Sequence, residues 1–266
     1  MTQETAELEA AVAAAWNTRG AGAPDPGLGQ SIDRVLRLLE SGELRVAEKG
    51  AGGWEVRDWV RKAVLLYFRT APMRVTNAGP LQFHDKIRLL DDWQRRGVRV
   101  VPPTVVREGA HIAPGAILMP CFVNIGAYVG ARTMIDSFAT VGSCAQVGAD
   151  CHVSAGVVVG GVLEPLNADP VIIEDRAFVG ANSSVLEGVH VGEGAVLAPG
   201  CHATRSTRII DEAGGGTFRG EVPAGAVVVP GAYAAEGSRV STYALVVKKY
   251  RDPRTDAKVE LNELLR

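Results

Sequence analysis

A chain of 266 residues with a formal net charge of −2 at pH 7 lacks the concentrated basic surface that an obligatory nucleic-acid partner requires. Hydrophobic residues make up 47% of the chain, enough for a sizeable core, yet no apolar run reaches the roughly 18–20 residues that a membrane span needs. The acidic opening MTQETAELEA does not resemble a secretion signal, and the four cysteines form no CxxC pair, so we expect buried thiols in a reducing cytoplasm.

The first hundred residues predict a helical domain, which we place at residues 1–100. Apolar residues recur at helical spacing over residues 5–19, over a second segment that Ser31 could cap, and over residues 55–69. In the second segment Val35, Leu38 and Leu39 share a face. A Gly/Pro stretch, GAGAPDPGLGQ, separates the first helix from the second.

From Val105 onward the period of the apolar residues changes to six, with His111 as the polar interruption. A fixed hexapeptide repeat predicts a left-handed parallel β-helix over residues 101–235, in which three hexapeptides make one coil and the aliphatic residue points inward. Two stretches interrupt it: GGVLEPLNADP, which we interpret as a two-residue insertion, and DEAGGGTFRGE. The other repeated positions are Ile117, Val123, Val129, Ile135, Val141, Val147, Val153, Val159, Ile173, Val179, Val185, Val191, Leu197, Ala203, Ile209, Val222 and Val228.

The C-terminal segment predicts a cap over residues 236–266. STYALVVKKY has the composition of a strand, and KVELNELLR that of a second strand or a short terminal helix. Such a cap would cover the open end of the coils, where backbone groups are otherwise unpaired.

Asp136 is the leading catalytic candidate, with Glu187 and Glu164 as further ones. An amine that attacks a thioester must lose a proton, and a carboxylate in a semi-enclosed cleft can accept it; an ordinary surface aspartate is the alternative. Counting the repeat places Asp136 and Glu187 eight hexapeptides apart, on different faces and roughly 13 Å apart along the axis. The two carboxylates could therefore meet only across a boundary between subunits.

Other residues have candidate binding roles. Arg99 could hold a substrate carboxylate or form a structural ion pair. The basic residues Lys248 and Lys249 could meet the phosphates of coenzyme A or be merely solvated, and the backbone N–H groups near Gly160 and Gly161 could stabilise an oxyanion. The sequence shows no nucleophile–base arrangement of serine or cysteine with histidine, so we expect direct attack without a covalent acyl-enzyme.

Histidines invite a metal-site hypothesis. After removal of the insertion, His152 and His190 fall on one face about two coils, or roughly 10 Å, apart, which is too far for one shared ion. We therefore expect no metal.

Taken together, these residues resemble the tetrahydrodipicolinate N-succinyltransferase family over nearly the whole chain. The matching stretches follow the family's order: SGELRVAEK, RKAVLLYFR, VRVVPPTVVREGAHIAPGAILMP, VNIGAYV, MIDSFATVGSCAQVG, GVVVGGVLEPLNADPVIIED, VPAGAVVV and ELNELLR. The resemblance implies a homotrimer with active sites between subunits. It also implies transfer of a succinyl group from succinyl-CoA, a co-substrate rather than a permanently bound cofactor, to the amino group of tetrahydrodipicolinate. The products would be N-succinyl-2-amino-6-oxopimelate and CoA, in lysine and diaminopimelate biosynthesis.

Arg99 and Asp136 match the family's substrate contacts, and two positions depart from its pattern. Many members have Ser-Glu-Val-Val-Glu-Gly where this chain has SSVLEG, so a proposed catalytic glutamate is replaced by Ser184. Either Glu187 or a water held by Ser184 substitutes, or that glutamate is not needed. Phe138 stands where tryptophan is common, and an aromatic wall would survive that change. The alternatives are another hexapeptide acyltransferase, with an acetyl donor and a sugar or amino-acid acceptor, or a non-catalytic trimeric scaffold.

Overall fold

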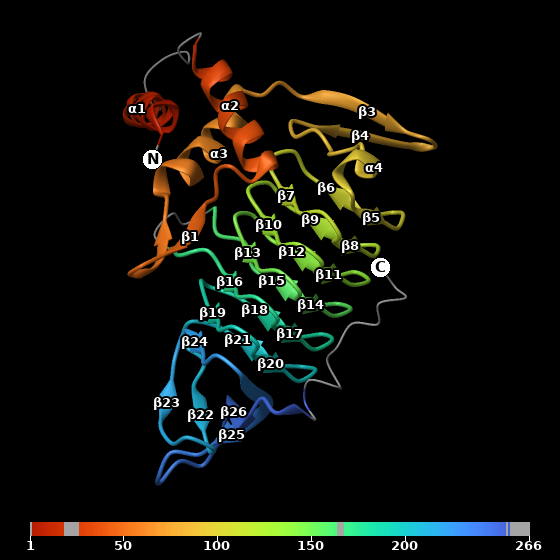
Figure 1. Ribbon diagram of the computed structural model, residues 1–266. Helices are drawn as coiled ribbons and strands as arrows, with labels where there is room; N and C mark the ends of the chain where they lie inside the picture. The colour runs from red at the N-terminus through yellow and green to blue at the C-terminus, as the bar shows by residue number, and fades with distance from the viewer. Residues whose placement is uncertain (1, 19–26, 164–167, 254, 256–266) are drawn as a thin grey trace.

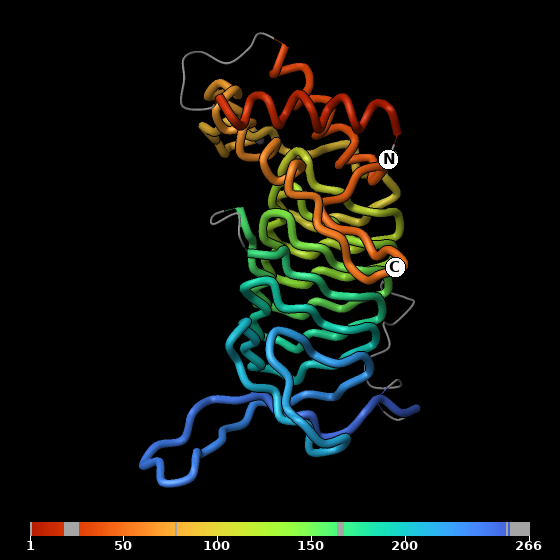
Figure 2. The backbone as a smooth tube through the Cα atoms, turned by 90° about the vertical axis from the view of Figure 1, so that its left-hand side faces the viewer, coloured from red at the N-terminus to blue at the C-terminus, as the bar shows by residue number. Residues whose placement is uncertain are grey.

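The computed structural model describes residues 2–18, 27–163, 168–253 and 255. The chain forms a stack of three-sided coils with helices at one end and a long-stranded sheet at the other (Figure 1). Seen from the side, the coils lie above one another, and the hairpin of β25 (Ala226–Tyr233) and β26 (Thr242–Tyr250) projects from the last of them (Figure 2). None of the described helices is both long and apolar enough to cross a membrane.

The three predicted helices are present, and they pack against one another. Helix α2 begins at Leu28, so the prediction that Ser31 caps it is wrong: the Ser31 hydroxyl instead donates to the carbonyl of Gly27 within the first turn. Two antiparallel hairpins were not predicted, because their short, largely exposed strands show no apolar alternation. The elements are α1 (Gln3–Asn17), α2 (Leu28–Ser41), β1 (Ala47–Gly50), β2 (Gly53–Val56), α3 (Asp58–Thr70), β3 (Arg74–Ala78), β4 (Leu81–Asp85) and α4 (Trp93–Arg96).

The core of the helical region extends onto the coils. The predicted apolar face of α2, with Val35, Leu38 and Leu39, is buried. This cluster includes Ile125 and Cys144, which lie at turns of the coil stack and are fully buried. The helices therefore share apolar contacts with the coils and are not an independent appendage.

Three parallel ladders run along the stack, and we name each face after its first strand. The β5 face contains β5 (Arg99–Val100), β8 (Ile117–Leu118), β11 (Met134–Ile135), β14 (His152–Val153), β17 (Phe178–Val179) and β20 (Val196–Leu197), and it continues into β25 (Ala226–Tyr233), β26 (Thr242–Tyr250), β22 (Ile209–Asp211) and β23 (Thr217–Phe218). The β6 face contains β6 (Val105–Val106), β9 (Phe122–Val123), β12 (Thr140–Val141), β15 (Val158–Val159), β18 (Ser184–Val185) and β21 (His202–Ala203). The β7 face contains β7 (His111–Ile112), β10 (Tyr128–Val129), β13 (Gln146–Val147), β16 (Ile172–Ile173), β19 (His190–Val191) and β24 (Glu221–Val222).

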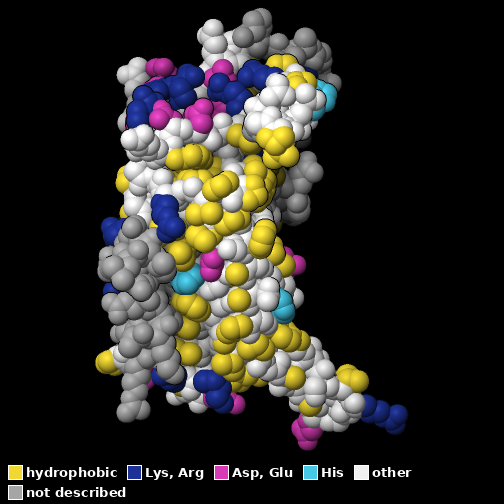
Figure 3. Space-filling view, turned by 90° about the vertical axis from the view of Figure 1, so that its right-hand side faces the viewer, with side chains coloured by type: hydrophobic (Ala, Val, Ile, Leu, Met, Phe, Trp, Pro, Cys, Tyr) yellow, Lys and Arg dark blue, Asp and Glu magenta, His cyan; other side chains and the backbone are white. Residues whose placement is uncertain are grey.

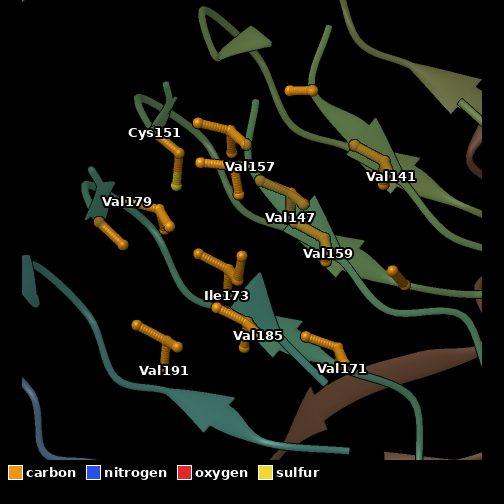
Figure 4. Packing of buried hydrophobic residues seen from close by; sticks show 14 of the residues in the cluster. Val141, Val147, Cys151, Val157, Val159, Val171, Ile173, Val179, Val185 and Val191 are labelled. Atoms are coloured by element: carbon orange, nitrogen blue, oxygen red, sulfur yellow. The ribbon is translucent and has the colours of Figure 1, made fainter. Parts of the chain in front are cut away.

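The second residue of each two-residue strand points into the coil. Figure 4 shows Val141, Val159 and Val185 stacked from the β6 face against Val147 and Ile173 from the β7 face. These side chains are at most 1% exposed. The hexapeptide period thus produces one continuous aliphatic column, as predicted.

The turns between strands stack as closely as the strands do. A Cβ atom on Gly142 would lie 2.2 Å from the backbone nitrogen of Gly161, one coil further on. A distance so short excludes any side chain at this position, so the glycine that follows Val141 is required by the approach of two backbones.

The predicted register of the inward residues is wrong at two places, in the first coils and near the last coil. Before Val123 the inward strand positions come one residue later than predicted, because the step from Leu118 to Val123 is five positions and not six. They are occupied by Val106, Ile112 and Leu118, and not by Val105, His111 and Ile117. His111 therefore points outward and interrupts nothing. Near the other end, Ile209 leaves the coil in β22, and Val222 continues the β7 ladder from Val191.

The stretch after Val159 is a larger insertion than predicted. Gln146 pairs with Ile172, twenty-six residues later, where neighbouring rungs are eighteen residues apart. The fourteen positions from Val159 to Ile173 are therefore one hexapeptide with eight inserted residues. The prediction counts two hexapeptides with two inserted residues. As a consequence His152 lies on the β5 face and His190 on the β7 face, so the prediction that they share a face is wrong.

At the C-terminal end, the predicted strand is β26. It pairs antiparallel with β25 and parallel with β22, and so extends the β5 face beyond the last coil. KVELNELLR lies outside the described residues.

Candidate active site

Asp136 lies at the corner where the chain passes from β11 to β12. Its Oδ1 accepts a hydrogen bond from the backbone N–H of Ser137 at 2.6 Å, and its own N–H donates to the carbonyl of Val153 at 2.8 Å. The side chain is 28% exposed. One carboxylate oxygen is thus fixed by the turn, and Oδ2 remains without a hydrogen bond from the described chain.

His152 lies beside this carboxylate. It is the ladder partner of Met134, and its Nε2 is 3.7 Å from Asp136 Oδ2. The imidazole meets the ring of Phe178 edge-on, with ring centroids 5.0 Å apart. Burial lowers the pKa of His152 and outweighs the opposing effect of Asp136, so the imidazole is neutral at pH 7.

Phe138 stands on the same turn and is the most exposed large hydrophobic residue described for this corner, at 78%. Its φ of 60° is in the left-handed region that favours glycine, so the turn presents this ring at some conformational cost. Phe138 lines a shallow apolar groove of about 280 Å³. The groove is completed by Pro103, Val105, Pro120, Cys121, Phe122, Ala139 and Thr140.

Arg99 occupies the outward position of β5, on the same face as the strand that precedes Asp136. The ladder runs from Arg99 through Ile117 to Met134, so two rungs, or about 10 Å along the axis, separate Arg99 from the level of Asp136. The arginine is exposed. In Figure 3, which views the molecule from this side, hydrophobic side chains form a band along the coils. The predicted carboxylate and cation thus share one side of the stack without touching.

Glu187 is placed elsewhere. It lies in the turn between β18 and β19, on a different corner of the coil from Asp136. The two turns are seven strands apart along the chain, where the sequence predicted eight hexapeptides. Its Oε2 accepts a hydrogen bond from the backbone N–H of Arg205 at 3.3 Å. The expectation that the two carboxylates project from different faces is confirmed, although the predicted count of steps was one too high.

The remaining predicted binding residues have structural partners or fall outside the described chain. The N–H of Gly160 donates to the carbonyl of Val185 at 2.8 Å, and Gly161 packs against the backbone of Ser143. Lys249 pairs with Asp252 at 2.7 Å and Lys248 with Glu212. Glu164 lies outside the described residues.

A second polar cluster, on the β7 face, was not predicted. The carboxylate of Glu174 accepts hydrogen bonds from Trp54 Nε1 at 2.7 Å and from Lys49 Nζ at 2.8 Å, and it lies 3.1 Å from His190 Nε2. Burial raises the pKa of Glu174, but these donors and the histidine outweigh it and lower the pKa to about 2. The cluster attaches the β1–β2 hairpin to the coils beside a pocket of about 500 Å³ that Arg45 and other residues line.

The cysteines and histidines of the described chain form no alternative centre. All four cysteines are buried thiols, and burial raises the pKa of each to about 12, which makes them poor nucleophiles. Within the described ranges, no three His, Cys, Asp or Glu side chains gather closely enough to hold a metal ion.

Comparison with known proteins places these features in a family. The N-terminal model of tetrahydrodipicolinate N-succinyltransferase matches residues 7–70, and two hexapeptide-repeat models, of succinyl-transferases and of bacterial transferases, match residues 170–204 and 126–161. The 2,3,4,5-tetrahydropyridine-2,6-dicarboxylate N-succinyltransferase of Dechloromonas aromatica is 46% identical over 98% of this chain and 99% of its own length. The chain belongs to the tetrahydrodipicolinate N-succinyltransferase family. The N-succinyltransferases of Sodalis glossinidius, 47% identical over 89% of this chain and 88% of that one, and of Acinetobacter baylyi, 46% identical over 89% of each, agree with this assignment.

Ser184 is the position at which the sequence departs from the glutamate that resemblance to the tetrahydrodipicolinate N-succinyltransferase family implies. Ser184 is the outward residue of β18, and its Oγ is hydrogen-bonded to Nδ1 of His202 at 2.9 Å. The backbone N–H of His202 in turn donates to the Tyr243 hydroxyl at 2.7 Å. This pair was not predicted, although the eighteen-residue ladder, in which Ser184 faces His202, would have revealed it.

Proposed function

We propose that this chain transfers a succinyl group from succinyl-CoA to the amino group of tetrahydrodipicolinate, with N-succinyl-2-amino-6-oxopimelate and free CoA as products. The observation that carries this proposal is identity of 46% along 98% of the chain with a relative of that name. The position of Asp136, on a corner with one oxygen fixed and one without a hydrogen bond from the described chain, is consistent with it.

Asp136 would act on the nucleophilic nitrogen. The amine attacks the thioester carbonyl carbon, the N–C bond forms, and the C–S bond breaks as the tetrahedral intermediate collapses. The proton that the nitrogen loses moves to Asp136 Oδ2 and then to the sulfur of CoA. One water is consumed beforehand, because hydration and ring opening of the cyclic imine free the amine and supply the oxygen of the oxo group. Because the cysteine thiols are buried and protonated, an acyl-cysteine intermediate is disfavoured.

Arg99 and Phe138 would bind substrate on either side of Asp136. A guanidinium offers parallel donors to a carboxylate, and tetrahydrodipicolinate has two carboxylates. Phe138 would form one wall of the site. For Glu164 we retain a role in acceptor binding, and for Gly161, Lys248 and Lys249 a role toward CoA. Gly160 would contribute shape only, since its N–H is engaged in the ladder.

We further infer a homotrimer with sites between subunits, located in the cytoplasm. The apolar groove beside Phe138 is open on one side, and Val158, an outward residue of the β6 face, is 44% exposed. A neighbouring coil stack would cover such surfaces and enclose the carboxylate. The four reduced thiols accord with a reducing compartment.

Thiol release from succinyl-CoA and from acetyl-CoA, each with and without tetrahydrodipicolinate, tests the proposal. We expect release that requires both succinyl-CoA and the acceptor, and a loss of about 100-fold in kcat/KM for Asp136→Asn at unchanged melting temperature and molecular mass. Release with acetyl-CoA alone would favour a different acyltransferase, and absence of release under all conditions would favour a scaffold. Light scattering measures the mass of the assembly.

A further inference from the structure

His152 has a buried ring nitrogen that no hydrogen bond satisfies. Nε2 is shielded from solvent and lacks a hydrogen-bond partner within the described chain. At 3.7 Å, its separation from Asp136 Oδ2 exceeds hydrogen-bond distance. A buried polar atom without a partner costs free energy, so its retention next to the candidate base needs an explanation.

The two atoms lie close enough together for one ligand atom to reach both. A nitrogen at ordinary hydrogen-bond distance, about 2.8 Å, from Oδ2 can at the same time lie about 2.8 Å from Nε2, because the two atoms are 3.7 Å apart. The ring-opened form of tetrahydrodipicolinate has a primary amine, which can donate one of its two N–H groups to each atom. Such a ligand would satisfy the imidazole nitrogen and the open carboxylate oxygen together.

We propose that His152 is a second substrate-contacting residue, whose Nε2 and Asp136 Oδ2 hold the acceptor amine between them. The inference rests on the proposed function and assigns a residue to it. One N–H of the amine donates to Nε2 and stays on the nitrogen, while the other loses its proton to Oδ2. The lone pair that attacks the thioester is thereby aimed away from both groups and toward the acyl carbon.

The surroundings of His152 suit an acceptor. Nε2 accepts a hydrogen bond only when the ring is neutral and the proton is on Nδ1. Burial favours the neutral ring, and the edge of Phe178 fixes the plane of the imidazole. The imidazole therefore places no positive charge against an amine that must itself be uncharged to attack.

Two substitutions at this position separate contact from packing. His152→Phe keeps a ring against Phe178 but removes the acceptor, whereas His152→Gln loses the ring and keeps a carbonyl oxygen that can accept. We expect kcat/KM for tetrahydrodipicolinate to fall about 100-fold in His152→Phe and about 10-fold in His152→Gln. A packing role predicts the reverse order. His190→Phe is the matched control, because His190 occupies the same strand position on another face, and its activity should stay within about twofold of wild type.

Calorimetric binding of tetrahydrodipicolinate without acyl-CoA tests the contact apart from turnover. We expect about tenfold weaker binding for His152→Phe and non-multiplicative losses when it is combined with Asp136→Asn. Unchanged affinity together with wild-type activity in a folded His152→Phe protein overturns the proposal, as does a phenylalanine variant more active than the glutamine variant. Failure of the wild type to transfer succinate refutes the proposed function instead, and the ratio of affinities still decides the role of His152.

Discussion

Ser184 and His202 stand on adjacent rungs of the β6 face and are joined by a hydrogen bond of 2.9 Å between Oγ and Nδ1. The family resemblance implies a glutamate in many members at the position of Ser184. The pair therefore offers polar side chains where this chain lacks that carboxylate. The alternative substitute, Glu187, is exposed at another turn and bonded to a backbone amide.

Substitution at Ser184 distinguishes these alternatives. We expect Ser184→Ala to lower kcat/KM about tenfold and Ser184→Glu to stay within about threefold of wild type, whereas Glu187→Gln should stay within about twofold. Steady-state kinetics with both substrates measures this. A larger loss for Glu187→Gln than for Ser184→Ala would identify Glu187 as the substitute.

Gly142→Ala should destabilise the coil stack. Its new Cβ would lie 2.2 Å from the backbone of the next coil, and overpacking of this kind costs about 1–3 kcal/mol or more. The control is Gly29→Ala in α2, where a Cβ meets nothing within 4 Å. Alanine favours a helix over glycine, so Gly29→Ala should raise the free energy of unfolding by up to about 1 kcal/mol. Urea denaturation measures both, and equal effects of the two would contradict the packing argument.

The polar cluster around Glu174 should make the free energy of unfolding decrease in acid. Because the pKa of Glu174 is lowered from 4.5 to about 2, its stabilising contribution is complete above about pH 4.5 and is lost as the pH falls toward 2. We expect Glu174→Gln to cost about 1–3 kcal/mol at pH 7 and to flatten the pH dependence in that window. Glu193→Gln removes an exposed ion pair instead, and it should cost no more than about 0.5 kcal/mol.

His111 should add a separate loss of stability at milder pH. Its Nδ1–H donates to the carbonyl of Glu40 at 2.8 Å, and the ring stacks on Tyr128. Burial, aided by Arg45 and Arg96, lowers the pKa of His111. Its contribution is therefore present above about pH 6.5, the ordinary value for histidine, and declines as the pH falls toward the lowered folded value.

Thermal unfolding between pH 7 and pH 5 checks this prediction. His111→Phe keeps a ring against Tyr128 and should show a flatter pH dependence than wild type. The same substitution at the exposed His84 should leave the slope unchanged. A wild-type slope retained in His111→Phe would mean that another group titrates in this range.

Much of the fold follows from a count of residues. The eighteen-residue ladder is visible in the sequence because each aliphatic residue must meet the next across one coil. Counting is nevertheless sensitive to small changes in length. One missing residue before Val123 turns His111 from the predicted inward position to an outward one. The eight-residue insertion after Val159 puts His190 on a face that the sequence did not predict. The hairpins were missed because four- and five-residue strands on the surface have no apolar period.

The sequence could identify candidate residues of the site, but not all of the side-chain contacts around them. Asp136 could be chosen from its chemistry and from the family pattern. Its neighbour His152 follows from the ladder, since Met134 pairs with a residue eighteen positions on. The Glu174 cluster could not be found in this way, because it joins the coils to a hairpin whose position depends on tertiary packing.

The eight residues inserted between β15 and β16 disturb no rung of the ladder, because Gln146 and Ile172 pair as neatly as Tyr128 and Gln146 do. A corner of this stack can therefore lengthen while every strand keeps its neighbour. The length of this insertion can thus be changed, by evolution or by grafting, without a change in the strand pairing on either side of it.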